Sequence, residues 1–310
     1  MKIIFFSTGE FGLPALKAIV GSKHDLLAVV TRPDQKKGRG WGAKPMPIKA
    51  VIEHIRPGLP VFLPETLDDK GFFDDINGYG ADVFVVIDYG LKLSKEILNG
   101  PKKYCINLHP SLLPKHRGAA PVNWAIIKGE TETGNTVFRM NEKMDAGDMI
   151  LQEGSPILEK DDAVELLQKL SQKGAKLLLK SLNLIEAGEE GFSVQDEKEV
   201  SFAPKLKKND GKIDWTEPAN VIERKIKGLV PWPCAFTHIE GKLLKVFKTE
   251  IMENVYGSAP GTIVDTEAFI VATGKGALKL KKVQLEGKKA MPAKEFIKGY
   301  RIDAELVLGE

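Results

Sequence analysis

The sequence has few cysteines, no long hydrophobic run and no strong excess of charge of one sign. Its 310 residues include only Cys105 and Cys234, too few for a disulfide framework or a cysteine zinc site and typical of a reducing cytoplasm. No apolar run approaches the roughly 18 residues that a membrane span needs. The opening MKIIFF run is followed closely by Glu10, so it predicts a first strand and not a signal peptide. We therefore expect a cytoplasmic protein with no membrane partner.

The common nucleotide-binding motifs are also missing. The first strand is followed by STGEFG at residues 7–12, which lacks the G-x-G-x-x-G spacing that brings backbone against a pyrophosphate. A P-loop pattern is absent as well. These absences argue against an NAD-dependent enzyme and a P-loop NTPase, although the fold can still be of the nucleotide-binding type.

The pattern of hydrophobic residues predicts two domains, as expected for a chain of this length. The first half alternates short apolar runs with amphipathic stretches, which favours an α/β domain with a Rossmann-like, mostly parallel sheet. The expected strands cover residues 2–7, 26–31, 60–63, 81–87, 105–109 and 136–140. The expected helices cover residues 13–20, 48–54, 94–98 and 163–186. This domain is predicted to end at residue 189.

After residue 189 the pattern changes. Residues 190–205 are polar without sustained periodicity and are predicted to form a linker. One helix at 219–226 is expected next, followed by short strands near 243–247, 261–264, 270–273 and 278–283 with glycine-containing turns between them. Several short strands separated by such turns favour a small OB-like β-barrel, here assigned to residues 206–310.

Basic residues are concentrated in two places. From Lys205 onward there are 19 Lys and Arg against 14 Asp and Glu, whereas the whole chain has a net charge of only +3. The connection at residues 32–45 carries five basic residues, three glycines and Trp41. This composition suits phosphates and unpaired bases. A solvated loop is the alternative, but an exposed tryptophan favours a binding role.

The run NLHPSLLPKHRGAAP at residues 107–121 is the most informative segment. It starts at the carboxyl end of a predicted strand, where open α/β sheets bind ligands. Asn107 and His109 are two residues apart and therefore share one face of that strand. An amide can hold an oxyanion, and an imidazole can move a proton near neutral pH. A core histidine beside a turn-forming asparagine is the alternative, but the adjacent apolar Ser-Leu-Leu-Pro run favours a ligand site.

A second polar cluster, MDAGD at residues 144–148, follows the strand predicted to end at Met140. Such an Asp-Gly pattern usually marks only a turn. It can also bring a carboxylate back to His109, where it would set the histidine tautomer or take part in proton transfer. The residues by themselves do not decide between Asp145 and Asp148.

Taken together and in this order, these features resemble the methionyl-tRNA formyltransferase family over nearly the full length of the chain. The matching segments are residues 5–16, TRPD and GRG in the basic loop, NLHPSLLPKHRGAAP, MDAGDM, IDW at 213–215, PWP at 231–233 and GKKAMPA at 287–293. The resemblance implies a formyltransferase fold of the Rossmann-like type followed by an OB-like barrel. One departure is Asp88, because the family usually has a small residue before Tyr-Gly in the strand wall of its folate pocket.

The resemblance also implies site residues. The catalytic residues of the family correspond to Asn107, His109 and Asp145. Its folate-binding residues correspond to Tyr89, Ser111, Leu112, Leu113 and Pro114. Its tRNA-binding loop corresponds to Lys36, Lys37, Arg39, Trp41 and Lys44.

The implied reaction is transfer of the formyl group of 10-formyltetrahydrofolate to the α-amine of initiator methionyl-tRNA, by a monomer and without a metal ion. Asn107 would hold the oxyanion, and His109 with Asp145 would move the proton. A folate-dependent formyltransferase acting on a small amine, such as an amino-sugar nucleotide, is the nearest alternative. The basic loop and basic C-terminal region argue against it, since a small amine needs neither. A non-catalytic RNA-binding protein, or a thiol enzyme using Cys105, fits less well.

Overall fold

The computed structural model describes residues 1–34, 46–67, 70–252, 257–300, 302 and 306–309. The chain forms two compact units. The first consists of Met1–Gly118, Glu132–Pro156 and Leu167–Ala203. The second consists of Ala119–Thr131, Ile157–Leu166 and Pro204–Glu310.

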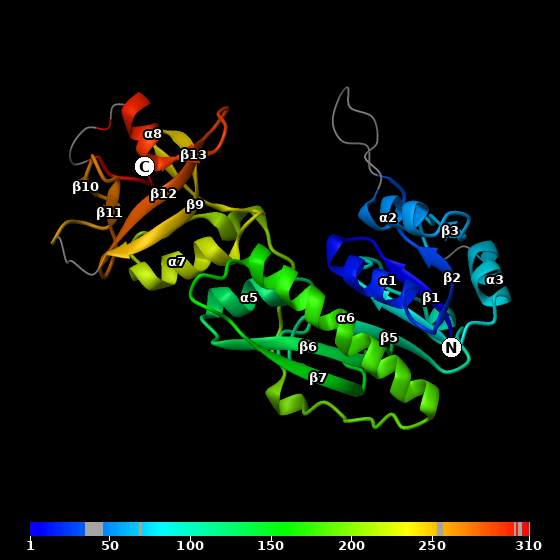
Figure 1. Ribbon diagram of the computed structural model, residues 1–310. Coiled ribbons are helices and arrows are strands. Elements are labelled where there is room, and N and C mark those ends of the chain that lie inside the picture. Colours follow the sequence, from blue (N-terminus) through cyan, green and yellow to red (C-terminus); the bar gives the residue numbers. More distant parts are fainter. Residues whose placement is uncertain (35–45, 68–69, 253–256, 301, 303–305, 310) are drawn as a thin grey trace. The chain divides into compact units, whose positions relative to one another are not determined.

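A seven-stranded sheet forms the centre of the first unit (Figure 1). Its strands, in spatial order, are β3 (Val61–Phe62), β2 (Asp25–Val30), β1 (Lys2–Ser7), β4 (Val83–Ile87), β5 (Tyr104–His109), β6 (Glu132–Arg139) and β7 (Met149–Pro156). The first five are parallel, and β6 and β7 are antiparallel. Every residue of β4 is buried, as expected for a central strand covered on both faces.

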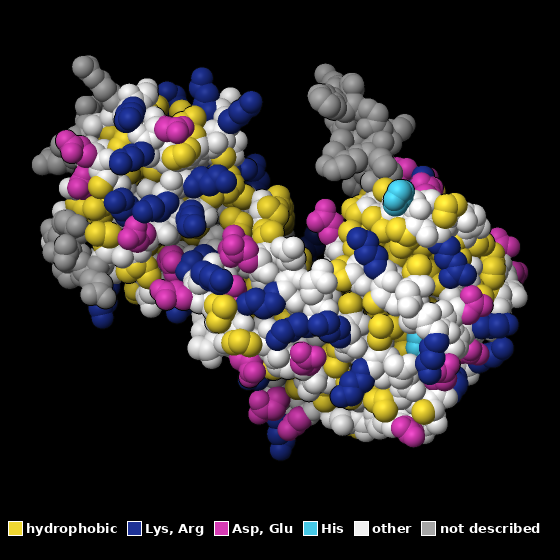
Figure 2. Space-filling model, in the orientation of Figure 1, with side chains coloured by type: hydrophobic (Ala, Val, Ile, Leu, Met, Phe, Trp, Pro, Cys, Tyr) yellow, Lys and Arg dark blue, Asp and Glu magenta, His cyan; other side chains and the backbone are white. Residues whose placement is uncertain are grey.

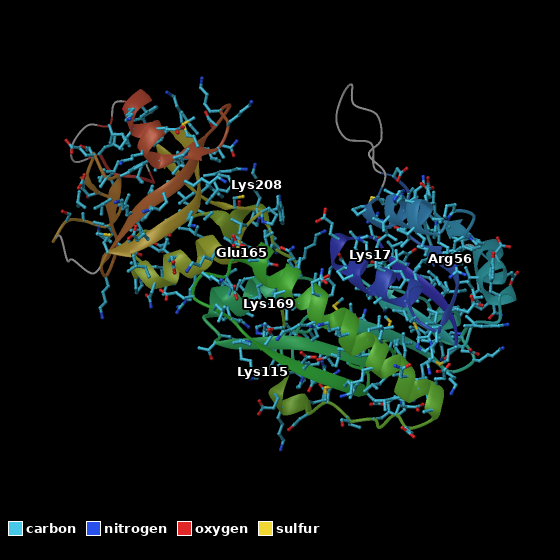
Figure 3. All side chains as sticks on the ribbon, in the orientation of Figure 1. Lys17, Arg56, Lys115, Glu165, Lys169 and Lys208 are labelled. Carbon is cyan, nitrogen blue, oxygen red and sulfur yellow. The ribbon has the colours of Figure 1, made fainter. Side chains whose placement is uncertain are left out.

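Helices connect and cover these strands. They are α1 (Leu13–Val20), α2 (Pro47–Ile55), α3 (Lys70–Gly78), α4 (Lys95–Leu98) and α6 (Ala163–Ala187), with the short 3₁₀ turns η1 (Glu10–Gly12) and η2 (Glu197–Glu199). The helices are amphipathic: Leu16 and Leu170 are fully buried, while Lys17 and Glu165 are exposed (Figure 3). Burial of such an apolar stripe supplies most of the stability of a surface helix.

The order of the strands determines where a ligand can enter. The chain runs from β1 outward through β2 and β3, then returns to the other side of β1 with β4 and β5. The connections therefore diverge between β1 and β4, and ligands of open α/β sheets bind at the carboxyl ends of the strands around such a point. The segments after β1, β4 and β5 are those that follow Ser7, Ile87 and His109.

The second unit contains a six-stranded antiparallel sheet. Its strands are β8 (Ala235–Ile239), β9 (Lys242–Met252), β10 (Ile263–Asp265), β11 (Ile270–Ala272), β12 (Ala277–Leu285) and β13 (Met291–Pro292). Its helices are α5 (Pro121–Lys128), α7 (Ala219–Gly228) and α8 (Ala293–Gly299), with the 3₁₀ turn η3 (Lys208–Gly211). Ile226 of α7, Leu244 of β9 and Leu278 of β12 meet in a core that also holds Trp215, whose Nε1 donates to Thr237 Oγ1 at 3.0 Å.

The predicted fold class, a Rossmann-like sheet followed by a separate small β domain, is confirmed. Among the elements not anticipated are α3, α5, β7, β8 and α8. α5 begins at Pro121, inside a stretch interpreted only as a ligand loop, because proline suits the first turn of a helix as well as a loop. Among the described residues, no helix is both long and apolar enough to cross a bilayer.

Candidate functional site

β5 carries Asn107 and His109 to the carboxyl edge of the sheet. Its register pairs Asn107 with Phe138 and His109 with Thr136 on β6, so the two polar side chains share one face of the strand. His109 is 6% exposed. The Oδ1 atom of Asn107 is buried and has no hydrogen-bond partner among the described residues. Because buried polar atoms are rarely left unpaired, this amide is a candidate for contact with a ligand.

The tautomer of His109 follows from its surroundings. Its Nε2 atom lies 3.0 Å from the backbone oxygen of His116. A carbonyl oxygen only accepts, so Nε2 carries the hydrogen and donates it. In the neutral imidazole Nδ1 is then an acceptor, and it is the nitrogen that can take up a proton.

Asp145, and not Asp148, faces that nitrogen. The Oδ2 atom of Asp145 lies 3.9 Å from His109 Nδ1 and accepts a 2.8 Å hydrogen bond from the backbone N–H of Gly118. Asp148 instead pairs with Arg139. When His109 is neutral and Asp145 is ionised, the two facing atoms, Nδ1 and Oδ2, are both hydrogen-bond acceptors. Such a pair can bind an N–H donor between them, or the imidazole can take up a proton.

Backbone strain is found at His116 and Asp145, which both approach His109, and also at Asp88. Asp88, His116 and Asp145 all have a positive φ, of 46°, 61° and 49°, a region that side chains other than glycine seldom adopt. Gly147 stands two residues after Asp145, and a Cβ added there would lie 1.7 Å from the backbone oxygen of Arg139. The turn therefore needs glycine at 147. Strained residues of this kind cluster at functional sites.

Residues 111–114 form a closely packed loop after β5. Ser111 Oγ donates to the backbone oxygen of Lys115 at 2.6 Å, and Leu113 is 2% exposed. The backbone of Leu113 is held twice: its N–H donates to Thr136 Oγ1 at 3.1 Å, and its carbonyl accepts from Gln152 Nε2 at 2.7 Å. The loop, which ends at Pro114, is therefore held rigidly by these hydrogen bonds. The Ser111 hydroxyl already donates to the Lys115 carbonyl.

Tyr89 and Asp88 follow β4. The Tyr89 ring packs edge-on against Phe6, with centroids 5.6 Å apart, and burial raises the pKa of its hydroxyl to about 12. The Tyr89 hydroxyl oxygen is buried without a hydrogen-bond partner among the described residues. Asp88 is exposed as a residue, but its carboxylate is crowded: a Cβ on Gly9 would lie 1.9 Å from its Oδ2 atom. The resulting loss of hydration raises the pKa of Asp88 to about 6.

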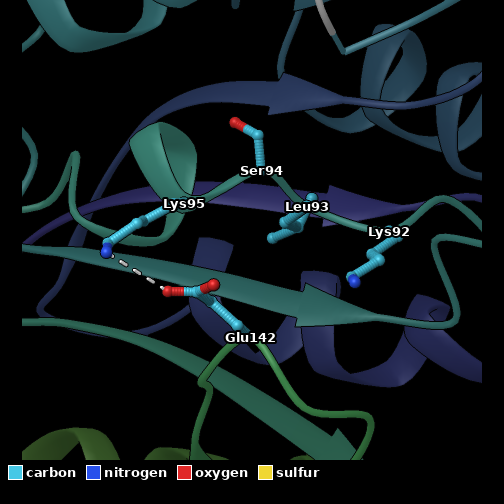
Figure 4. Close-up of a pocket in the computed structure, with 5 residues that line it drawn as sticks. All are labelled: Lys92, Leu93, Ser94, Lys95 and Glu142. Atoms are coloured by element: carbon cyan, nitrogen blue, oxygen red, sulfur yellow. Dashed lines mark ion pairs between the residues drawn. The ribbon is translucent and has the colours of Figure 1, made fainter.

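The predicted tRNA-binding residues Lys36, Lys37, Arg39, Trp41 and Lys44 lie outside the described residues. A depression of about 250 Å³ lies beside the loop that follows β4 (Figure 4). It is lined by Lys92, Leu93, Ser94, Lys95 and Glu142, and Lys95 pairs with Glu142 at 3.5 Å. Asn107, His109 and Asp145 do not line this depression.

The thiol alternative is unfavourable. Cys105 is 2% exposed, its Sγ lies 3.7 Å from Met140 Sδ, and burial raises the pKa of the thiol. A thiol is nucleophilic only as the thiolate. Among the described residues, no group of three or more His, Cys, Asp or Glu side chains could hold a metal ion.

Sequence reasoning missed three residues next to the proposed site. Gln195 Nε2 donates to the backbone oxygens of Asp145 and Gly147, both at 2.8 Å. Arg117 Nε donates to Gln195 Oε1 at 3.0 Å, and Ser201 Oγ accepts from the backbone N–H of His116 at 3.0 Å. Gln195 and Ser201 lie in the segment predicted to be a linker, and no periodicity in the sequence marks them.

Comparison with known proteins places the chain in a family. Residues 1–182 match the formyl transferase family and residues 205–301 its C-terminal domain. The chain is 41% identical, over the full length of both, to the methionyl-tRNA formyltransferase of Alkaliphilus oremlandii.

Two solved structures share the fold. HypX from Aquifex aeolicus, solved with tetrahydrofolic acid, has a TM-score of 0.69 at 20% identity, covering 98% of this chain and 49% of HypX. An N-formyltransferase from Helicobacter canadensis, solved with folinic acid and dTDP-3-aminofucose, has a TM-score of 0.65 at 18% identity, covering 93% and 100%. Identities this low show only a shared fold. The 41% identity to the Alkaliphilus oremlandii protein over the full length of both chains shows a shared family. The chain belongs to the methionyl-tRNA formyltransferase family.

Proposed function

We propose that this protein transfers the formyl group of 10-formyltetrahydrofolate to the α-amino group of initiator methionyl-tRNA in the cytoplasm. The observation that carries the proposal is the meeting of His109 and Asp145 at the carboxyl end of β5, with their facing atoms 3.9 Å apart. Asn107 lies on the same strand as His109, and its amide oxygen has no partner among the described residues. The membership of the chain in the formyltransferase family supplies the reaction type.

Each polar side chain has a role in such an acyl transfer. The attack of a neutral amine on a formyl carbon creates negative charge on oxygen and leaves a surplus proton on nitrogen. The amide of Asn107 would donate to the oxygen, a contact typically worth about 2.7–4 kcal/mol in the barrier. His109 would take the proton at Nδ1, since Nε2 is committed to the His116 carbonyl. Asp145 would stabilise the resulting imidazolium. When the tetrahedral intermediate collapses and the bond between the formyl carbon and the folate nitrogen breaks, His109 would return the proton to that departing nitrogen.

The loop after β5 is proposed to bind the formyl donor. Leu112, Leu113 and Pro114 supply an apolar surface, which is held in place by the hydrogen bond that Leu113 N–H donates to Thr136 and the one that its carbonyl accepts from Gln152. A surface fixed in advance loses little entropy when a flat ring packs on it. We propose that Tyr89 and Ser111 contribute by shaping this region, because the Tyr89 ring packs in the core and the Ser111 hydroxyl is bonded within the loop.

The second unit is proposed to bind the tRNA backbone, together with the basic loop at residues 36–44. Lys and Arg side chains are prominent over this unit on the face drawn in Figure 2. Lys248 of β9 and Lys282 of β12 are both exposed and pair where the register of the two strands is irregular. Lys282 Nζ lies 5.9 Å from the centre of the Phe247 ring. Exposed cations of this kind can neutralise the phosphates of a bound polyanion such as tRNA.

The test is formyl transfer from 10-formyltetrahydrofolate to initiator methionyl-tRNA, with wild type beside His109→Ala. Transfer by wild type and its loss in the variant would support both the substrate and the site. Transfer to a small amine such as an amino-sugar nucleotide, with none to tRNA, would overturn the tRNA assignment and keep the chemistry. Full activity of His109→Ala would reject the proposed site.

A further inference from the structure

The segment after α6 is bonded along its length to the loops that carry the proposed site. Ser193 forms a two-way backbone bridge with Met149, with N–O distances of 2.9 and 2.8 Å. Further along, Ala203 N donates to the backbone oxygen of Arg117 at 2.8 Å. Residues 193–203, called the brace below, therefore lie on the first unit and do not hang free between the two units.

The brace reaches the Asp145 turn through Gln195. This side chain is 5% exposed, and both hydrogens of its amide nitrogen are used, on the carbonyls of Asp145 and Gly147. The two hydrogen bonds therefore hold both Asp145, whose φ is positive, and Gly147, where the turn requires glycine. A single side chain thus fixes the backbone from which the Asp145 carboxylate projects.

Gln195 is itself held in orientation. Its Oε1 atom accepts from Arg117 Nε at 3.0 Å, which forces the amide nitrogen toward the turn. The Arg117 guanidinium is nearly buried and also pairs with Glu197 of the brace at 2.9 Å. The planar guanidinium of Arg117 thus binds two polar side chains of the brace, Gln195 and Glu197, with fixed geometry.

The brace reaches the histidine side of the site as well. Ser201 Oγ accepts from the backbone N–H of His116, and the His116 carbonyl is the acceptor that fixes Nε2 of His109. The brace therefore supports both partners of the proton-transfer pair, each through one intervening backbone segment.

We propose that Gln195 is a positioning residue for this reaction, acting on Asp145 through the backbone of residues 145–147, with Ser201 in a parallel role toward His109. The inference rests on the proposed function, because it assigns these residues to the formyl-transfer site. Asp145 must be held at its distance of 3.9 Å from His109 to stabilise the imidazolium that forms when His109 takes the proton, and an error of about 1 Å in such an arrangement can cost about 100-fold in rate.

Gln195→Glu is the sharpest perturbation. The new side chain has the same shape and keeps an oxygen for Arg117, but it no longer donates to the two carbonyls at neutral pH. We expect kcat to fall about 10- to 100-fold with little change in either KM. We also expect the pH at which kcat is half-maximal to move by about half a unit or more. Gln195→Met, which removes the donors without adding charge, should change kcat and the pH profile in the same way.

Gln152→Glu is the matched control. Gln152 also anchors backbone through an amide nitrogen, at Leu113 O and Thr136 Oγ1, but in the loop assigned to the formyl donor. We expect it to raise the KM for 10-formyltetrahydrofolate and to leave the pH profile of kcat unchanged. Melting temperatures of all variants show how much of each effect is loss of stability.

A double-mutant cycle separates positioning from general stability. In an Asp145→Ala background, Gln195→Glu should cause no further loss of kcat, because the group it positions is gone. Additive losses, or an unchanged pH profile in both Gln195 variants, would overturn the inference while leaving the proposed function intact. If wild type forms no formyl-methionyl-tRNA, or Asp145→Ala is fully active, the proposed function or site has failed instead.

Discussion

Replacing Asp145 by Asn removes one charge from the proposed site and changes almost nothing else. In the wild type, Asp145 Oδ2 accepts a hydrogen bond from the N–H of Gly118 at 2.8 Å. The side-chain oxygen of Asn can accept the same bond, so the turn keeps its shape. What is lost is the attraction between the carboxylate and an imidazolium formed at His109 when it takes the proton.

The separation of the two groups gives the size of the effect. At 3.9 Å and an effective dielectric constant of about 20, two unit charges attract by about 4 kcal/mol. Since about 1.4 kcal/mol corresponds to a tenfold change in rate, complete loss of this attraction would slow the proton-transfer step about 1,000-fold. This value falls within the range of about 100- to 10,000-fold usual for general acid–base catalysis.

The assay is single-turnover formylation of methionyl-tRNA at saturating donor, with wild type, Asp145→Asn and Asp148→Asn compared. Asp148 is the control, because it lies three residues away and pairs with the exposed Arg139, an interaction worth about 0–1 kcal/mol. We expect a loss of about 100- to 1,000-fold for Asp145→Asn and near-normal rates for Asp148→Asn. Equal losses in both variants, or a small loss in the first, would refute the electrostatic argument.

Three further variants test other parts of the site. Asn107→Ala should lower kcat about 100- to 1,000-fold with little change in either KM, and a change confined to KM would contradict the oxyanion role. Arg39→Ala should raise the KM for tRNA and flatten its dependence on salt; an unchanged salt slope would show that the basic loop does not contact phosphates. Asp88→Asn should raise the melting temperature at pH 8 but not at pH 4, and equal shifts at both would contradict it.

The sign of the Asp88 prediction follows from its pKa, which is raised from an ordinary 3.8 to about 6 by the crowding over Gly9. The folded protein holds this proton more tightly than the unfolded chain. The stabilising contribution of Asp88 is therefore fully present below about pH 4, and this contribution is lost as the pH rises through about 6. Asn cannot ionise and does not incur that loss.

The strands of the first unit were the most predictable elements. Val83–Ile87 is apolar throughout, short and rich in β-branched residues, which together favour a strand buried on both faces. The strand β7 was missed because its residues show no apolar alternation. β7 contains Gln152, Glu153 and Gly154 and is held in place by its pairing with β6.

For the site, the sequence was sufficient to propose Asn107 and His109 as neighbours, because a spacing of two residues in a strand fixes a common face. It could not choose between Asp145 and Asp148 on physical grounds. That choice depends on a positive φ at Asp145 and on the N–H of Gly118, 27 residues earlier in the chain. Side-chain contacts of this kind leave no periodic trace in a sequence.

The sequence by itself therefore determined the two-part α/β and β architecture, the face shared by Asn107 and His109, and the location of the basic segments, because these follow from local periodicity and composition. Only the tertiary structure decided which carboxylate faces His109, which of its nitrogens carries the hydrogen, and that Gln195, in a segment without periodicity, bonds to the turn that carries Asp145. Each of these depends on contacts between residues distant in sequence, and such contacts exist only once the chain has folded.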